Sequence, residues 1–172
     1  GQNKAVSAAK SLHGLNAQVH VQTYSQFMDG AHLRQVLPDY DIVIDATDKL
    51  ENKFLINDVC VSAEKPFVHG GITGFSGQVM TYVPEKGPCY RCIFGEVPED
   101  NAPAPIPVIG VTAGIIGTIQ AAEAIRYLLG IPSLLTGKLL VLDGLRMQFR
   151  TVPFPHVSEH CPLHTRKGVT DL

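Results

Sequence analysis

The stretch Ile42-Val-Ile-Asp45-Ala-Thr-Asp48 decides the fold class, because an unbroken apolar run ends there in two carboxylates. Such runs are typical of parallel strands that are covered on both faces. Open α/β sheets bind their ligands at the carboxyl ends of their strands. We therefore expect a buried strand with Asp45 at its end, and Asp48 in a turn where a ligand can bind.

The segments around this stretch alternate between helical and strand patterns. Apolar residues have helical spacing in residues 4–15, 31–37 and 50–63, whereas residues 19–24 and 66–69 have strand character. This β-α-β-α-β order predicts right-handed crossovers and a mostly parallel, Rossmann-like sheet.

The second half of the chain predicts antiparallel strands appended to that sheet. Glycines alternate with apolar residues in residues 70–83, and residues 138–142 and 147–152 have the pattern of a hairpin. Residues 111–129 form a mostly apolar helical pattern whose small residues would let another backbone approach closely. We expect one α/β domain over residues 1–172.

The segment before that last helix contains four prolines. Because proline lacks a backbone N–H and fixes φ, neither a helix nor a central strand persists there. We expect residues 93–110 to form a flexible crossover loop. The prolines are Pro98, Pro103, Pro105 and Pro107.

The composition excludes several classes of function. A chain of 172 residues with 45% hydrophobic and 17% charged side chains can bury a core as one domain. Its net charge of -2 supplies no field that would hold nucleic acid or anionic lipid. No apolar run reaches the about 20 residues that span a membrane, and no secretory leader is evident, so we expect a cytoplasmic location.

Two ligand pairs with the same gap predict a metal site. Cys89-Tyr-Arg-Cys92 and Cys161-Pro-Leu-His164 each separate two ligands by two residues, which lets one turn aim both at one ion. Cys3His is an established structural zinc set without an open position. The site would clamp the tail, residues 153–172, against the middle of the chain.

Other interpretations of these residues remain open at this point. Cys89 and Cys92 alone would fit a thioredoxin-like redox pair, and His160 is a possible ligand in place of His164. Cys60 lies in a helical pattern away from the others, and we expect it to pack in the core.

The Asp48 side chain has two possible roles. It could cap the helix that follows, or it could hold Mg²⁺ against a nucleotide triphosphate. The local sequence alone favours capping.

Seven segments together carry a likeness to a known family, and their order matches over nearly the whole chain. In that order they resemble the ThiF/MoeB/HesA family, the bacterial E1-like enzymes. The segments are Gly1-Gln-Asn-Lys4, Asp45-Ala-Thr-Asp48, Asn57-Asp-Val-Cys60, residues 70–79, Cys89-x-x-Cys92, residues 114–123 and Cys161-x-x-His164.

The resemblance implies ATP-dependent adenylation of the C-terminal Gly-Gly carboxylate of a ubiquitin-like sulfur carrier, in thiamin or molybdopterin biosynthesis. It implies that Asp48 is the aspartate that binds magnesium with ATP, that Lys4 reaches the ATP phosphates, and that the protein is a homodimer. Both roles are electrostatically reasonable, since such transfers depend on positioning and on neutralising phosphate charge.

The sequence also departs from the family pattern. The family's glycine-rich nucleotide loop precedes the point where this chain begins, so we expect a C-terminal portion that is inactive alone. Lys49 and Lys53 stand where the family commonly has Asn and Arg, which keeps charge but loses the planar fork of Arg. Residues 101–108 contain no cysteine, which excludes thiol chemistry from that loop. The last zinc ligand, His164, is usually Cys.

Two other functions compete with adenylation. The chain could belong to a non-catalytic relative that binds a carrier or partner without activating ATP, as the missing cysteine and Lys49 would suggest. A nicotinamide-dependent oxidoreductase fits the α/β pattern, but it lacks the phosphate loop and leaves the metal ligands unexplained.

Overall fold

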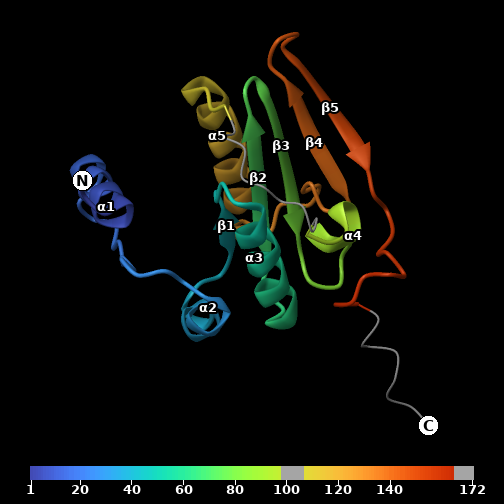
Figure 1. Ribbon diagram of the computed structural model, residues 1–172, viewed down its shortest axis with the longest axis horizontal. Helices are drawn as coiled ribbons and strands as arrows, with labels where there is room; N and C mark the ends of the chain where they lie inside the picture. Colours follow the sequence, from blue (N-terminus) through green and yellow to red (C-terminus); the bar gives the residue numbers. More distant parts are fainter. Residues whose placement is uncertain (98–106, 165–172) are drawn as a thin grey trace.

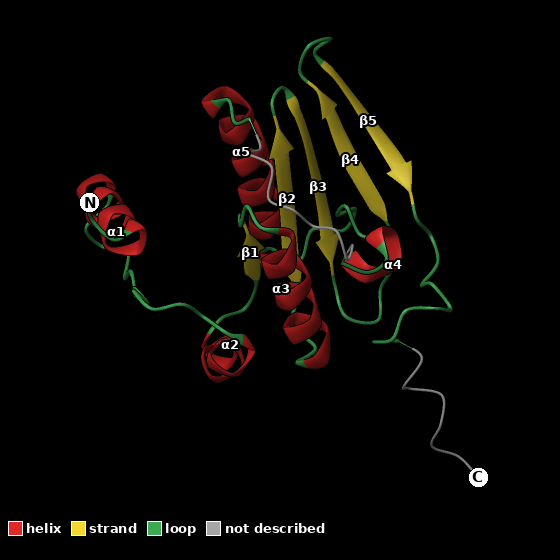
Figure 2. Ribbon diagram, viewed as in Figure 1, coloured by secondary structure: helices red, strands yellow, loops and turns green. Residues whose placement is uncertain are grey.

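The computed structural model describes residues 1–97 and 107–164, and it shows an α/β domain (Figures 1 and 2). A central sheet carries α3 and α5 on opposite faces, while α1 stands apart from the sheet. The helices are α1 (Lys4–Leu15), α2 (Gly30–Val36), the 3-10 helix η1 (Leu37–Asp39), α3 (Leu50–Ser62), α4 (Tyr90–Phe94) and α5 (Gly110–Leu128). The strands are β1 (Val43–Asp45), β2 (Phe67–Thr73), β3 (Ser76–Tyr82), β4 (Lys138–Asp143) and β5 (Gln148–Pro153).

The sheet has the strand order β1-β2-β3-β4-β5. Strands β1 and β2 are parallel, with Ile44 opposite Val68, and the remaining neighbours are antiparallel. The α/β class and the appended antiparallel strands are thus confirmed. The sequence predicted a mostly parallel sheet, whereas in the described sheet the parallel part consists of the β1–β2 pair.

The strand expected at residues 19–24 does not form, and this accounts for part of the difference. These residues belong to the connection between α1 and α2, where Val19 is 55% exposed. Alternating side chains do not make a strand by themselves, since the ladder needs a partner and an apolar surface to cover. No residue of α1 is buried either. The edge strand β1 is also less covered than predicted, because Ile44 is 47% exposed.

Successive residues of β2 point to the two halves of the core. Phe67 packs with Phe54 and Cys60 of α3, as expected for a buried Cys60. Val68 packs with Ile116 of α5 on the other face. This alternation fixes the layers, because side chains of a strand point to opposite faces in turn.

Two glycines let α5 lie close to the sheet. A Cβ at Gly70 would come within 2.4 Å of the Gln120 side chain, and one at Gly77 within 2.5 Å of Ile116. Both distances are far below contact, so side chains there would push α5 away. Glycine in this hairpin therefore serves the packing of α5.

The proline-rich segment is only partly described. Residues 93 and 94 lie in α4 instead of the expected loop, and Val108 forms a bridge with Gly74 before α5 begins. The remainder, residues 98–106, lies outside the described residues, as does the end of the predicted tail after residue 164. None of the helices in the described parts combines the length and apolarity needed to cross a bilayer.

Candidate functional site

The structure gathers four predicted ligands into one cluster. Single ligand atoms of Cys89, Cys92, Cys161 and His164 all lie within 4.8 Å of one another. The Cys89 sulfur is 3.7 Å from the sulfurs of both Cys92 and Cys161, and all three cysteines are free thiols. This arrangement can hold a metal ion, and it accounts for Cys161 and His164, which a redox pair would leave unexplained.

His164 supplies independent support for a metal. Its Nε2 atom is buried, and no group of the described chain forms a hydrogen bond with it. Buried polar atoms without partners are rare in folded proteins, and a metal ion would satisfy this one. His160 is exposed and is not part of the cluster, so the geometry selects His164.

The turn that carries Cys89 and Cys92, called the cysteine turn below, is hydrogen-bonded to α3. The Tyr90 backbone N–H donates to Asn57 Oδ1 over 2.8 Å. The Arg91 guanidinium donates to both oxygens of Asp58 over 2.6 and 2.7 Å, and it lies 4.8 Å from the centre of the Phe54 ring. Asn57 and Asp58 belong to a segment that carries the family likeness, but this role has no local signature, because it depends on contacts between distant segments.

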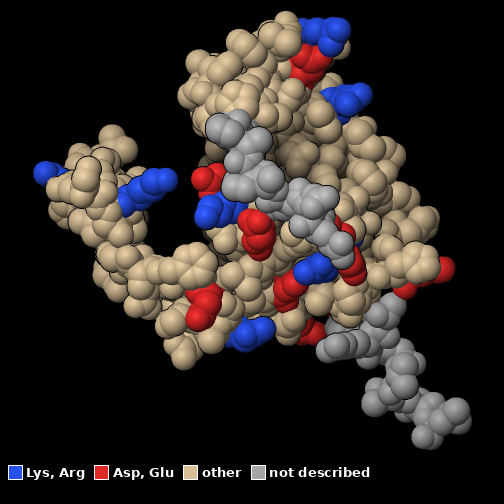
Figure 3. All heavy atoms as spheres, viewed as in Figure 1, with Lys and Arg blue, Asp and Glu red and all other residues tan. Residues whose placement is uncertain are grey.

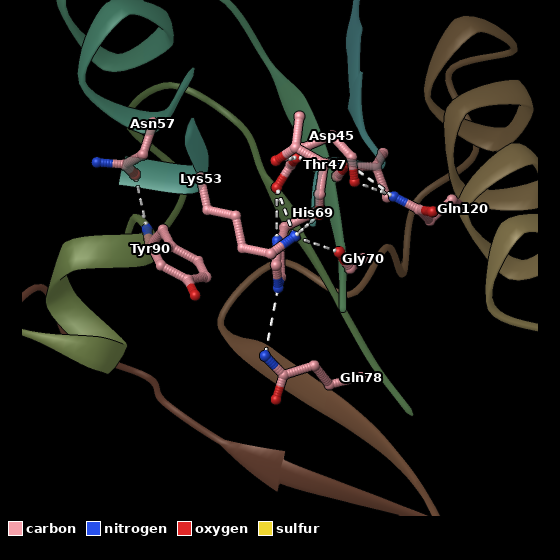
Figure 4. A network of polar contacts seen from close by, with 10 residues as sticks. Asp45, Thr47, Lys53, Asn57, His69, Gly70, Gln78, Tyr90 and Gln120 are labelled. Carbon is pink, nitrogen blue, oxygen red and sulfur yellow. Dashed lines mark hydrogen bonds and ion pairs between the residues drawn. The ribbon is translucent and has the colours of Figure 1, made fainter. Parts of the chain in front are cut away.

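The second candidate site lies at the end of β1, where Asp45 is only 1% exposed (Figure 4). One carboxylate oxygen accepts from the backbone N–H and the hydroxyl of Thr47, over 3.0 and 2.7 Å. The other lies 2.8 Å from Nδ1 of His69 and 3.5 Å from Nζ of Lys53. Burial by itself raises the pKa of Asp45, but its contacts with His69, Lys53 and Thr47 outweigh burial and hold that pKa below its ordinary value.

His69 is fully buried between the carboxylate and β3. Burial lowers the pKa of His69 more than Asp45 raises it, so the imidazole is neutral. Its Nδ1–H then donates to Asp45, and its Nε2 accepts from the Gln78 amide over 3.3 Å. The ring of Tyr90 lies 4.6 Å away at an angle of 61°, which connects this network to the start of α4.

Lys53, which stands where the family commonly has Arg, points into the protein. Its side chain is only 10% exposed, and Nζ donates to the carbonyl oxygens of Thr47 and Gly70 over 2.5 and 2.9 Å. From the opposite face, Gln120 Nε2 donates to the carbonyl oxygen of Asp45 over 2.7 Å. Figure 4 shows Lys53 and Gln120 approaching the end of β1 from different elements.

Asp48 is exposed in the turn between β1 and α3. The capping interpretation is wrong, because Lys49 is the N-cap of α3 and no side chain caps that helix. Lys4 is exposed at the start of α1, which stands apart from the sheet (Figure 1). The structure therefore does not bring Lys4 and Asp48 together. On the face in Figure 3, acidic and basic side chains are interspersed, in keeping with the small net charge.

The fold and the two sites define a class of protein: an α/β domain with polar groups at a strand end and a separate Cys/His cluster that can hold a metal ion. A sequence model of the ThiF family matches residues 1–163. The chain belongs to the ThiF family.

Comparisons with known proteins agree with this assignment. The SAMP-activating enzyme E1 of Haloferax volcanii is 40% identical over 100% of this chain and 64% of its own length. The sulfur carrier protein adenylyltransferase of Thermus thermophilus is 38% identical over 95% of this chain and 63% of its own length. The adenylyltransferase and sulfurtransferase MOCS3 of Drosophila persimilis is 34% identical over 96% of this chain and 39% of its own length. The chain thus spans less than two thirds of these relatives.

A solved structure shows the same fold. The chain matches E. coli MccB in complex with ATP with a TM-score of 0.79 and 21% identity, over 95% of this chain and 51% of MccB. At this identity the likeness concerns the fold alone.

The pH dependence of stability tests the assignment of a neutral His69. The pKa of His69 is lowered in the folded protein. Near pH 6.5, this imidazole therefore binds a proton in the unfolded chain but not in the folded chain. The contribution of His69 to the free energy of unfolding should therefore be complete above about pH 6.5. As the pH falls below this value, the free energy of unfolding should decrease by up to about 1.4 kcal/mol per pH unit because of this group.

The measurement is urea unfolding of the wild type, His69→Gln and His160→Gln between about pH 7.5 and 5. We expect His69→Gln to flatten the dependence and the exposed His160→Gln control to leave it unchanged. Equal slopes for wild type and His69→Gln would contradict the neutral assignment.

Proposed function

We propose that this chain is part of an adenylyltransferase that activates a ubiquitin-like sulfur carrier in thiamin or molybdopterin biosynthesis, in the cytoplasm. A carboxylate oxygen of the carrier's C-terminal Gly-Gly attacks the α-phosphorus of ATP. The bond from that phosphorus to the bridging oxygen breaks, and pyrophosphate leaves an acyl-adenylate behind. Membership of the ThiF family and the names of the relatives support this reaction.

One observation carries the proposal within this chain: Asp48 is exposed at the carboxyl end of β1 and does not cap α3. A carboxylate that is left available at this place fits a magnesium ion bound to the phosphates of ATP, since Mg²⁺ binds through one or two carboxylates together with phosphate oxygens. We assign Asp48 to magnesium and to catalysis, because neutralising phosphate charge is the main catalytic requirement.

Lys4 is proposed as a second contact to the ATP phosphates. This role requires α1 to lie closer to the end of β1 than it does in Figure 1. Because the chain covers only part of its relatives, we propose that it adenylates a carrier only as part of a longer protein and is inactive alone.

For the metal cluster we propose structural zinc, bound by Cys89, Cys92, Cys161 and His164. Three thiols and an imidazole are ligands that zinc prefers, and four protein ligands complete a tetrahedron without a position for substrate. Zinc held in this way contributes on the order of 10 kcal/mol to folding.

We also propose a homodimer. The helix α5 presents small and apolar residues on the side away from the sheet, where Ile125 and Leu128 are each 56% exposed. Gly114 and Gly117, earlier in the same helix, are also exposed, with nothing within 4 Å of a Cβ placed there. A second copy could therefore approach this helix closely.

A non-catalytic carrier-binding protein is the second candidate. Two observations favour it: Lys4 lies apart from Asp48, and Lys53 is directed toward backbone oxygens instead of the exposed turn. The two candidates differ in whether pyrophosphate is released.

Elemental analysis of the purified chain tests the zinc proposal. We expect one zinc per chain in the wild type and in His160→Ala. In His164→Ala we expect zinc binding to be lost or weakened, because of these two histidines only His164 belongs to the cluster. Proteolysis should then cut the zinc-depleted variant first after Pro153. A wild-type chain without zinc in which Cys89 and Cys92 oxidise to a disulfide would contradict the proposal.

Pyrophosphate release by the natural-length protein, with ATP and a carrier, tests adenylation. Asp48→Asn should lower kcat/KM by about 100-fold or more, since the magnesium ligand is lost. The matched control is Asp41→Asn, an exposed aspartate before β1, which should behave as wild type. Carrier binding by a wild type that releases no pyrophosphate would favour the non-catalytic candidate, and an active Asp48→Asn would remove Asp48 from the mechanism.

A further inference from the structure

We propose that Lys53 is a positioning residue that fixes the turn carrying Asp48, rather than a group that contacts the nucleotide. The inference rests on the proposed role of Asp48 in binding magnesium with ATP. It concerns how this chain keeps that carboxylate in place before any ligand arrives.

The position of Asp48 is set through its neighbour Thr47. Asp48 is exposed and does not cap α3, so its own side chain does not tie it to that helix. Thr47 is held at three atoms: its N–H and hydroxyl donate to Asp45, and its carbonyl oxygen accepts from Lys53 over 2.5 Å. Fixing both peptide groups of Thr47 leaves the backbone little freedom at Asp48.

Lys53 joins three elements at one atom. It lies in the first turn of α3, and its Nζ contacts Thr47 after β1, Gly70 in β2, and the Asp45 carboxylate 3.5 Å away. On the other face, Gln120 of α5 donates to the carbonyl oxygens of Asp45 and Val68 over 2.7 and 3.2 Å. The end of β1 is thus held from α3 and from α5.

The contacts of Lys53 also determine its charge. An ammonium group has three donors and no acceptor, and the three nearby groups are all acceptors, so the geometry matches the charged form. Burial lowers the pKa of Lys53 more than the negative charges of Asp45 and Asp48 raise it, so that pKa lies below its ordinary value. With its donors directed at protein oxygens and 10% of its side chain exposed, Lys53 has little left to offer a phosphate.

Direct binding of phosphate by Lys53 is the competing interpretation, and the ligand-free protein separates the two. A positioning role predicts that removing the ammonium loosens the Asp48 turn without any nucleotide. A direct role predicts an unchanged turn and a raised KM for ATP alone.

The experiment compares the natural-length wild type with Lys53→Met and Lys65→Met. Lys65 is a matched control because its Nζ also donates to a backbone oxygen, that of Tyr40, but it lies before β2, at the opposite end of the parallel strands. Hydrogen exchange of the Thr47 amide is followed without ligand, and kcat/KM for ATP is measured by pyrophosphate release.

We expect exchange at Thr47 to be at least about 10-fold faster in Lys53→Met, and kcat/KM to fall by about 10- to 100-fold through kcat as well as KM, since small misplacements are costly in catalysis. Lys65→Met should change neither quantity. Unchanged exchange at Thr47 in Lys53→Met overturns the inference, as does faster exchange with unchanged kcat/KM, which is the signature of a merely structural role.

Failure of the proposed function is distinguishable from failure of this inference. If the wild type binds a carrier but releases no pyrophosphate, the proposed function fails, and if Asp48→Asn keeps full activity, the proposed role of Asp48 fails. The exchange comparison needs no ATP and still reports whether Lys53 holds the turn. If Lys53→Met does not fold, Lys53→Gln, which keeps two N–H donors on a shorter side chain, is measured with the same two outcomes.

Discussion

The carboxylate of Asp45 is almost completely removed from water, and an ionised group is stable there only because donors surround it. Those donors come from Thr47 in the following turn, His69 in β2 and Lys53 in α3. The carboxylate therefore joins the parallel strand pair, the helix after it and the exposed turn. The burial of one charge accounts for the order of this whole corner of the sheet.

The helix α3 connects that corner to the Cys/His cluster. Its first turn supplies Lys53, its middle supplies Asn57 and Asp58 to the cysteine turn, and Phe54 lies against Tyr90 and beneath Arg91. At about 1.5 Å per residue a helix is a stiff spacer over this distance. The two sites are thus parts of one packed unit, although the cluster offers no chemistry to the strand end.

Local patterns were sufficient to predict much of this arrangement. The spacing of Cys89, Cys92, Cys161 and His164 predicted the cluster, because two-residue gaps impose a geometry that survives in the fold. The apolar run at residues 42–44 correctly predicted β1, and the glycine-rich segment predicted the β2–β3 hairpin.

The remainder depends on contacts that the sequence does not display. The alternation at residues 19–24 predicted a strand, but a strand also requires a partner. Lys53 stands where the family commonly has Arg, but the direction of its side chain is decided by carbonyl oxygens of Thr47, after β1, and of Gly70 in β2. The buried His69 likewise had no local signature, since only the pairing of Asp45 with His69 across the strands creates its environment.

The energetic coupling between Asp45 and Lys53 measures whether the buried carboxylate and the ammonium hold each other in place. It is obtained from urea unfolding of the wild type, Asp45→Asn, Lys53→Met and the double variant. We expect the two changes to be non-additive, with a coupling free energy of at least about 1 kcal/mol, because each single change leaves the other buried charge without its partner. Additive effects of the two substitutions would contradict it.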